Sequence, residues 1–202
     1  MSGDEDAGLP LTAADLPKAH AELAEWADPW EFRRRVDGFH QRSRSKEIFN
    51  DPKRKFLLDA WVLSELSERQ QFGQIRLAAD GEEWPDGYAR TDRGELKIEV
   101  TTALFPGRRL GAEYRFEGRM RMHHDPEEDW IERAESIPAQ LDQVVSAKVE
   151  KHYGSPFALV VYLNISEYGI RRAETERAIA TIKDRYGPKF QHLWILWNGQ
   201  VF

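Results

Sequence analysis

The stretch EEWPDGYARTDRGELKIEVTTA, residues 82–103, decides the fold of this 202-residue chain. Its second half alternates apolar and polar residues, which is typical of a strand with one buried and one polar face. The segment TDRG, residues 91–94, is a turn signal between this strand and the preceding segment WPDGYAR. The stretch therefore predicts a β-hairpin whose polar face carries carboxylates and a lysine.

The length of the turn decides which polar side chains face each other. If TDRG is a four-residue loop, the opposed pairs are Arg90 with Glu95, Tyr88 with Lys97, and Asp86 with Glu99. Directly opposed side chains lie about 5 Å apart at Cβ, so Asp86 and Glu99 are expected to share a cation that offsets their repulsion. Glu95 lies near the turn, about 13 Å along the strand from Glu99, and is expected to pair with Arg90. A three-residue loop would instead put Asp86 on the apolar face.

The rest of the chain predicts further helices and strands around this hairpin. Asp-Pro pairs at residues 28–29 and 51–52 are helix start signals, and Pro138 is expected to bend or divide a helix. The segment FALVVYLNI is continuously apolar and predicts a strand buried on both faces. The last strand is expected to turn back through Asn198 and Gly199. Helices are expected near residues 11–27, 28–41, 52–69, 129–154 and 171–187, and strands near 74–79, 83–90, 95–103, 157–165 and 191–202. This pattern predicts an α/β fold with a mixed sheet.

Composition limits the class of protein. We expect an acidic tail and helical arm over residues 1–45 and an α/β domain over residues 46–202. There is no cysteine, which excludes disulfides and cysteine-held metals. There is no run of 18 apolar residues, and the N-terminal segment lacks the pattern of a secretory signal. We therefore expect a cytoplasmic protein that does not enter a membrane.

Charge is unevenly distributed along the chain. The net charge is −6, and the first 28 residues are acidic. Basic residues gather over residues 33–55 and again over residues 108–121. Two interpretations stay open for these segments: solvated helix faces, or local contacts with phosphates, which need no overall positive charge.

The hairpin carries the residue types that metal-dependent phosphodiester hydrolysis needs. Carboxylate oxygens bind hard cations such as Mg²⁺, and a nearby lysine stabilises developing negative charge. Beyond this chemistry, WPDGYARTDRGELKIEVT resembles the PD-(D/E)xK nuclease superfamily, and the order of the elements expected from residue 52 to residue 197 is similar to its core. The resemblance implies a restriction-endonuclease-like fold of order αβββαβαβ, with a central mixed sheet flanked by helices and preceded by the helical arm.

The resemblance also implies a set of site residues. Pro85-Asp86 matches the motif's Pro-Asp, and Glu99-Val100-Thr101 matches its second part, with Thr101 where the family has lysine. Asp86 and Glu99 are therefore the expected metal ligands. The displaced lysine is either Lys97 or Lys148, on the following helix. Asp59, on the first core helix, is a further candidate acid, with Glu65 as the other choice there; the alternative for Asp59 is a structural contact with a neighbouring arginine or the backbone.

The leading interpretation is a nuclease-like protein that uses Mg²⁺ or Mn²⁺ to hydrolyse DNA phosphodiester bonds, with Arg108 and Arg109 gripping phosphates. Enzymes of this fold often act as homodimers, so a homodimer is one expected assembly. Two alternatives stay open. Thr101 favours an inactive binding or assembly module of the same fold, and the net negative charge suits a protein-interaction domain that does not act on nucleic acid.

Overall fold

The α/β class predicted from the sequence is confirmed. The computed structural model describes residues 9–43, 48, 51–107, 127–151, 153, 155–167 and 169–202. Six strands form one mixed sheet in the order β1-β2-β3-β4-β5-β6. In chain order the elements are α1 (Leu16–Leu23), α2 (Pro29–Gln41), the 3₁₀ turn η1 (Pro52–Arg54), α4 (Lys55–Gln70), β1 (Gln74–Leu77), β2 (Gly87–Thr91), β3 (Gly94–Leu104), α5 (Glu127–Glu150), β4 (Ala158–Asn164), α6 (Arg172–Tyr186), the 3₁₀ turn η3 (Gly187–Lys189), β5 (His192–Trp197) and β6 (Gln200–Val201).

The chain divides into two compact units, which we describe one at a time. The described residues up to Ile98 form the first unit, and those from Glu99 onward form the second, so that β3 crosses the boundary. Within the described residues, none of the helices is both long and apolar enough to cross a membrane.

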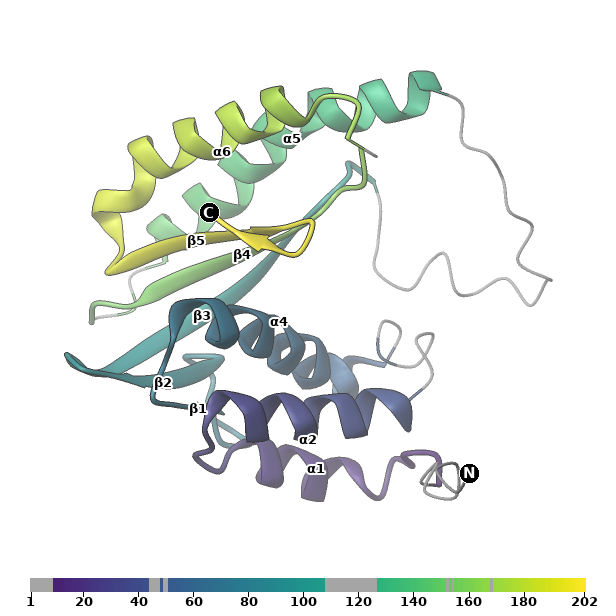
Figure 1. Cartoon of the computed structure of the whole chain (residues 1–202), viewed down its shortest axis with the longest axis vertical. Coiled ribbons are helices and arrows are strands. Elements are labelled where there is room, and N and C mark those ends of the chain that lie inside the picture. Colours follow the sequence, from purple (N-terminus) through teal and green to yellow (C-terminus); the bar gives the residue numbers. More distant parts are fainter. Residues whose placement is uncertain are drawn as a thin grey trace. The chain divides into compact units, whose positions relative to one another are not determined.

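In the first unit, three helices pack with an antiparallel arrangement of strands. Helix α2 lies between α1 and α4 (Figure 1), and β1 pairs with β2, which pairs with β3. The Asp28 side chain caps α2 by accepting a hydrogen bond from the Glu31 N–H at 2.9 Å, and Pro29 occupies the first helical position, as the sequence predicted. Fully buried side chains from these elements, such as Phe32, Leu63 and Ile75, form the core.

The arm also contributes to the sheet. Ala27, in the connection between α1 and α2, bridges to Ile75 in β1 through two backbone hydrogen bonds, of 3.1 and 2.8 Å. The helices predicted as an arm therefore belong to the same compact unit as α4 and the hairpin.

The hairpin has the register that the four-residue loop predicted. Arg90 pairs with Glu95 and Tyr88 pairs with Lys97. The pairing also continues one step further toward the turn, to Thr91 and Gly94, so only two residues form the tip. The tighter turn leaves these two pairs unchanged, because shortening the loop by one residue on each side preserves the register. The pairing of β2 with β3 ends at Gly87 and Ile98, so the third predicted pair, Asp86 with Glu99, lies outside it.

In the second unit, α5 and α6 pack together and against β4 and β5 (Figure 1). Strand β4 is largely buried and pairs in parallel with β5, with α6 as the connection that parallel strands require. Residues Asn198 and Gly199, both with positive φ, form the turn from β5 to β6 that was predicted there. The predicted division at Pro138 is absent, since α5 continues through that exposed residue as one helix.

Candidate functional site

Asp86 is held by backbone pairing and by a close approach of α4. Its carbonyl oxygen accepts a hydrogen bond of 3.0 Å from the Ala78 N–H, directly beyond the pairing of Leu77 with Gly87. A Cβ atom at Gly87 would lie 2.5 Å from the Leu63 Cδ1 atom and 2.8 Å from the backbone oxygen of Arg76. Glycine therefore lets the strand lie against α4 at the residue that follows Asp86.

A second carboxylate and a lysine lie beside Asp86 in the first unit. We call Lys55, Asp59 and Asp86 the Lys55 cluster. The Lys55 Nζ atom lies 2.7 Å from the Asp59 Oδ2 atom and 3.7 Å from the Asp86 Oδ1 atom. Asp59 is only 7% exposed, and a carboxylate so buried needs a compensating charge. The two acids therefore converge on one positive charge, a group that the sequence did not suggest.

A polar pocket opens beside this cluster. It has a volume of about 130 Å³, which corresponds to roughly four waters at their liquid volume. Its walls come from α1, α4 and the loop between β1 and β2, and its lining includes His20, Phe56, Asp59, Glu82, Pro85 and Asp86. His20 lies edge-on to the Phe56 ring at 4.8 Å, and burial lowers the pKa of its imidazole, opposed by the charge of Asp80.

A third acid forms a separate cluster in the second unit. We call Glu99, Lys148 and Tyr153 the Glu99 cluster. The Glu99 Oε1 atom accepts hydrogen bonds from the Lys148 Nζ atom at 2.5 Å and from the Tyr153 hydroxyl at 3.0 Å. Glu99 is 7% exposed, and the side chain of Lys148 is 16% exposed. Lys148 of α5 thus forms an ion pair with Glu99 of β3, while the catalytic role of either residue stays a prediction.

The other lysine candidate has a different environment. The Lys97 Nζ atom lies over the Trp84 ring, 4.6 Å from its centroid. Such an interaction holds an ammonium by the negative face of the ring. Thr101 is half-buried in β3. Arg108 and Arg109 lie outside the described residues.

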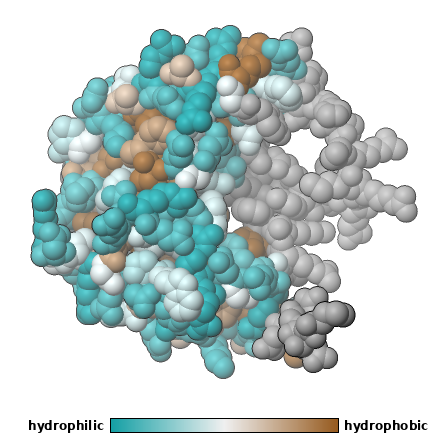
Figure 2. Space-filling view, viewed as in Figure 1, coloured by the Kyte–Doolittle hydropathy of each residue, from teal (hydrophilic) through white to brown (hydrophobic). Residues whose placement is uncertain are grey.

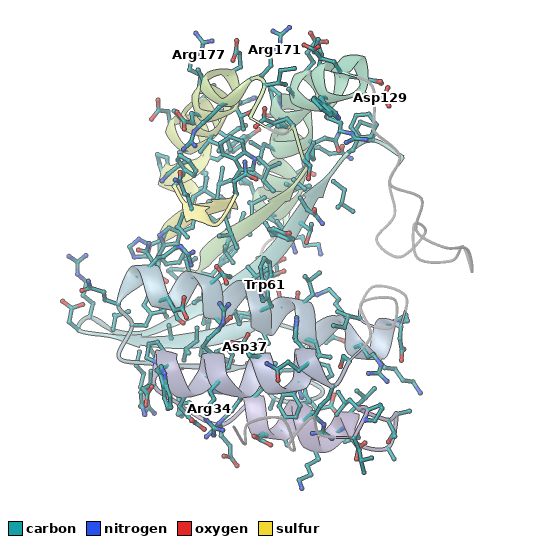
Figure 3. The ribbon with its side chains drawn as sticks, turned by 45° about the vertical axis from the view of Figure 1, so that its right-hand side comes forward. Arg34, Asp37, Trp61, Asp129, Arg171 and Arg177 are labelled. Carbon is teal, nitrogen blue, oxygen red and sulfur yellow. The ribbon has the colours of Figure 1, made fainter. Side chains whose placement is uncertain are left out.

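The basic segment at the start of the chain makes internal ion pairs. Arg34 and Arg35 both bind Glu31, and Arg33 binds Asp37 and Glu65. Arg34 and Asp37 are labelled on α2 in Figure 3, and the surface over α2 is mostly hydrophilic in Figure 2. These ion pairs favour a structural role for the three arginines over a role in phosphate contact. The contact with Arg33 also places Glu65 in an ion-pair cluster between α2 and α4.

One pairing expected from the hairpin does not form. Arg90 and Glu95 are opposite each other in the register, but within the described part of the chain no ion pair joins them. The Arg90 guanidinium instead lies over the Trp26 ring, 4.2 Å from its centroid, and its Nη1 atom donates to the Gln74 Oε1 atom at 2.6 Å. The register was predicted correctly, but the predicted ion pair between Arg90 and Glu95 was wrong, because Trp26 and Gln74 bind the guanidinium instead.

Neither Lys55 nor Tyr153 was predicted as a site residue, and only the contact of Lys55 could have been predicted from the sequence. Lys55 lies four residues before Asp59 on a helix, a spacing that brings side chains together, so this contact was open to prediction. Tyr153 follows α5 and had no such signal. Among the described residues, no group of three or more His, Asp or Glu side chains is arranged to hold a metal ion.

No protein-family model, no curated protein and no solved structure matches this chain.

Proposed function

We propose that this chain is a Mg²⁺-dependent nuclease-like protein that hydrolyses DNA phosphodiester bonds. The observation that carries the proposal is the convergence of Asp59 and Asp86 on one positive charge beside a polar pocket. Carboxylate oxygens are the ligands that Mg²⁺ takes in proteins, and Mg²⁺ keeps several waters, for which a pocket of about 130 Å³ has room. Asp59 and Asp86 supply oxygen ligands of the kind that Mg²⁺ takes, and coordinated waters would have to complete the coordination shell.

Asp86 and Glu99 are the proposed metal ligands, with Asp59 as the supporting acid. This assignment rests on the resemblance of the motif and on the facing pair predicted from the sequence. A bound Mg²⁺ would supply positive charge to the phosphate and lower the pKa of a coordinated water.

The remaining chemistry falls to a lysine. Hydrolysis forms a bond between a water oxygen and phosphorus and breaks one ester P–O bond, whose oxygen leaves with a proton. The Lys148 Nζ atom donates a hydrogen bond to Glu99, and we assign this lysine the role of stabilising the negative charge that develops on the phosphate. We further propose that DNA is the substrate and that the protein acts in the cytoplasm.

One observation favours the second candidate, an inactive binding module of the same fold. The ammonium of Lys55 already compensates the two carboxylates of the Lys55 cluster, and Thr101 stands at the motif's lysine position. In that case the cluster needs no metal ion.

The two candidates differ in their response to Mg²⁺. We would titrate Mg²⁺ and Mn²⁺ calorimetrically into the wild type, Asp86→Asn and Glu99→Ala, and incubate each with supercoiled and single-stranded DNA. Glu95→Gln, an exposed acid on the same strand, is the matched control. Metal binding and nicking that are lost in Asp86→Asn and Glu99→Ala but kept in Glu95→Gln support the nuclease.

A further variant tests the role of Lys55 in the same cluster. In Lys55→Met the two acids lose their ammonium, so a metal site should bind Mg²⁺ more tightly than in the wild type and gain stability from the ion by mass action. An absence of metal binding in both the wild type and Lys55→Met would refute the nuclease and leave the inactive module.

A further inference from the structure

A cluster of arginines and aromatic rings lies on the polar face of the hairpin sheet. We call Trp26, Arg76, Tyr88 and Arg90 the aromatic–arginine cluster. The Arg76 guanidinium lies over the Tyr88 ring at 4.1 Å and near the Trp26 ring at 5.1 Å, and Arg90 lies over Trp26 at 4.2 Å. Tyr88 is buried, whereas Trp26 and Arg76 are partly exposed and Arg90 is exposed, so the last three form the accessible part of the cluster. Arg76 is paired directly across from Tyr88 in the ladder of β1 and β2. The residues that alternate with them, such as Ile75, are buried in the core.

The two arginines of this cluster have no acidic partner among the described residues. Within the described ranges, no carboxylate lies within 4.0 Å of the guanidinium of Arg76 or Arg90, whereas each arginine at residues 33–35 is paired with an acid. The rings hold both guanidinium planes, so less side-chain entropy is lost when a ligand binds them. Unneutralised cations held in place on a sheet face indicate an anionic ligand.

The cluster is also connected to the proposed catalytic pocket within the same unit. The Tyr88 hydroxyl donates a hydrogen bond of 3.2 Å to the Glu82 Oε2 atom, and Glu82 lines the pocket together with Asp86. On the other side of Tyr88, its cross-strand partner Lys97 lies over the Trp84 ring. Arg76 of β1, Tyr88 of β2 and Lys97 of β3 therefore form a row of cationic and aromatic side chains across these three strands. This row lies beside Asp86, the proposed metal ligand.

We propose that the aromatic–arginine cluster binds an unpaired DNA strand and leads it to the pocket at Asp86. Unpaired bases stack on aromatic rings and on arginine planes, while the cations contact the phosphates. Duplex DNA offers phosphates but no exposed base faces, so it should use only part of this surface. The direction toward the pocket rests on the proposed nuclease function; the binding itself does not.

Binding is tested without metal, so that it is separated from cleavage. Fluorescence anisotropy in EDTA would follow a labelled oligodeoxythymidine of about 16 nucleotides, with a duplex of equal length for comparison. Trp26→Ala and Arg90→Ala should each weaken single-strand binding by roughly tenfold, and Arg90→Ala should reduce the salt slope by about one. Arg34→Ala makes the same charge change on an arginine paired with Glu31, and should leave the affinity nearly unchanged.

Two further variants keep the result interpretable. Trp26→Phe retains a ring and should restore most of the affinity that Trp26→Ala loses; urea denaturation of each variant shows whether it is folded. Asp86→Asn should bind the oligonucleotide like the wild type while losing nicking, which would separate the two proposals. The inference is overturned if the wild type does not bind the single strand, if it prefers the duplex, or if Arg34→Ala weakens binding as much as Arg90→Ala.

Discussion

The pair of Glu99 and Lys148 offers the sharpest test of how the second unit is held together. The Nζ and Oε1 atoms lie 2.5 Å apart, and both side chains are mostly shielded from water. At an effective dielectric constant of about 20, two unit charges at that distance attract by roughly 7 kcal/mol, most of which is offset by the cost of removing both charges from water.

Removing either Glu99 or Lys148 leaves the other charged group buried without the attraction that offsets its loss of hydration. Lys148→Met leaves the Glu99 carboxylate buried with the Tyr153 hydroxyl as its remaining partner in the cluster, so we expect a loss of about 3 kcal/mol in the free energy of unfolding. Glu99→Gln should cost a similar amount by stranding the ammonium. The double variant should cost clearly less than the sum, which gives a coupling free energy of about 2–3 kcal/mol.

The assay is a double-mutant cycle by urea denaturation of the full chain. Lys183, a partly exposed lysine in the last turn of α6, provides a control in Lys183→Met, which should change stability by less than about 0.5 kcal/mol. Additive losses in the cycle would mean that the two groups do not interact in solution, and the reasoning about the Glu99 cluster would then be wrong.

Three further predictions concern the first unit. Gly87→Ala should destabilise by roughly 1–3 kcal/mol because its Cβ would meet Leu63 and the backbone, whereas Gly38→Ala in α2, with open space around it, should stabilise by about 1 kcal/mol; equal effects in urea denaturation would contradict this. Burial lowers the pKa of His20 from 6.5, so the contribution of the neutral imidazole to the free energy of unfolding is fully present above pH 6.5 and falls as the pH drops through the lowered pKa. The difference in stability between the wild type and His20→Phe should therefore change between about pH 7.5 and pH 5.5, and a constant difference would refute this prediction. Hydrogen bonds from Arg34 and then Arg35 lower the pKa of Glu31 from 4.5 to about 2. The stabilisation that the Glu31 carboxylate gives the fold is therefore present above pH 4.5 and is lost as the pH falls to about 2. Circular dichroism of the wild type and Glu31→Gln across this pH range would detect the loss.

The sequence predicted those parts of the structure that depend on neighbours along the chain. The alternation of residues 95–103 and the TDRG turn predicted the hairpin and limited its register to two alternatives, because a pleat of period two and a short turn admit few others. Asp28 was recognised as a helix cap for the same local reason. The sequence named Lys97, on the same strand as Glu99, and Lys148, on the following helix, as candidates for the displaced lysine, and Lys148 is the one that contacts Glu99.

The remainder depends on which elements pack together. Arg90 could not be assigned to Trp26 in advance, because the competition with Glu95 is decided by a residue from a distant segment. Tyr153 lies beyond the end of α5, where no periodicity indicates a direction. Predictions from the motif alone also left out Lys55, whose relation to Asp86 requires α4 to lie beside the loop that precedes β2.

The backbone bridge between Ala27 and Ile75 has a consequence for how the protein can be shortened. These two hydrogen bonds cover one outer edge of the sheet, and an uncovered edge strand is a template for pairing with other chains. A chain that begins at residue 46 would lose this cover together with the apolar faces of α1 and α2, and should therefore self-associate in a concentration-dependent manner. We therefore expect residues 1–45 to limit aggregation through the edge of the sheet, and a fragment designed to isolate the hairpin should retain them.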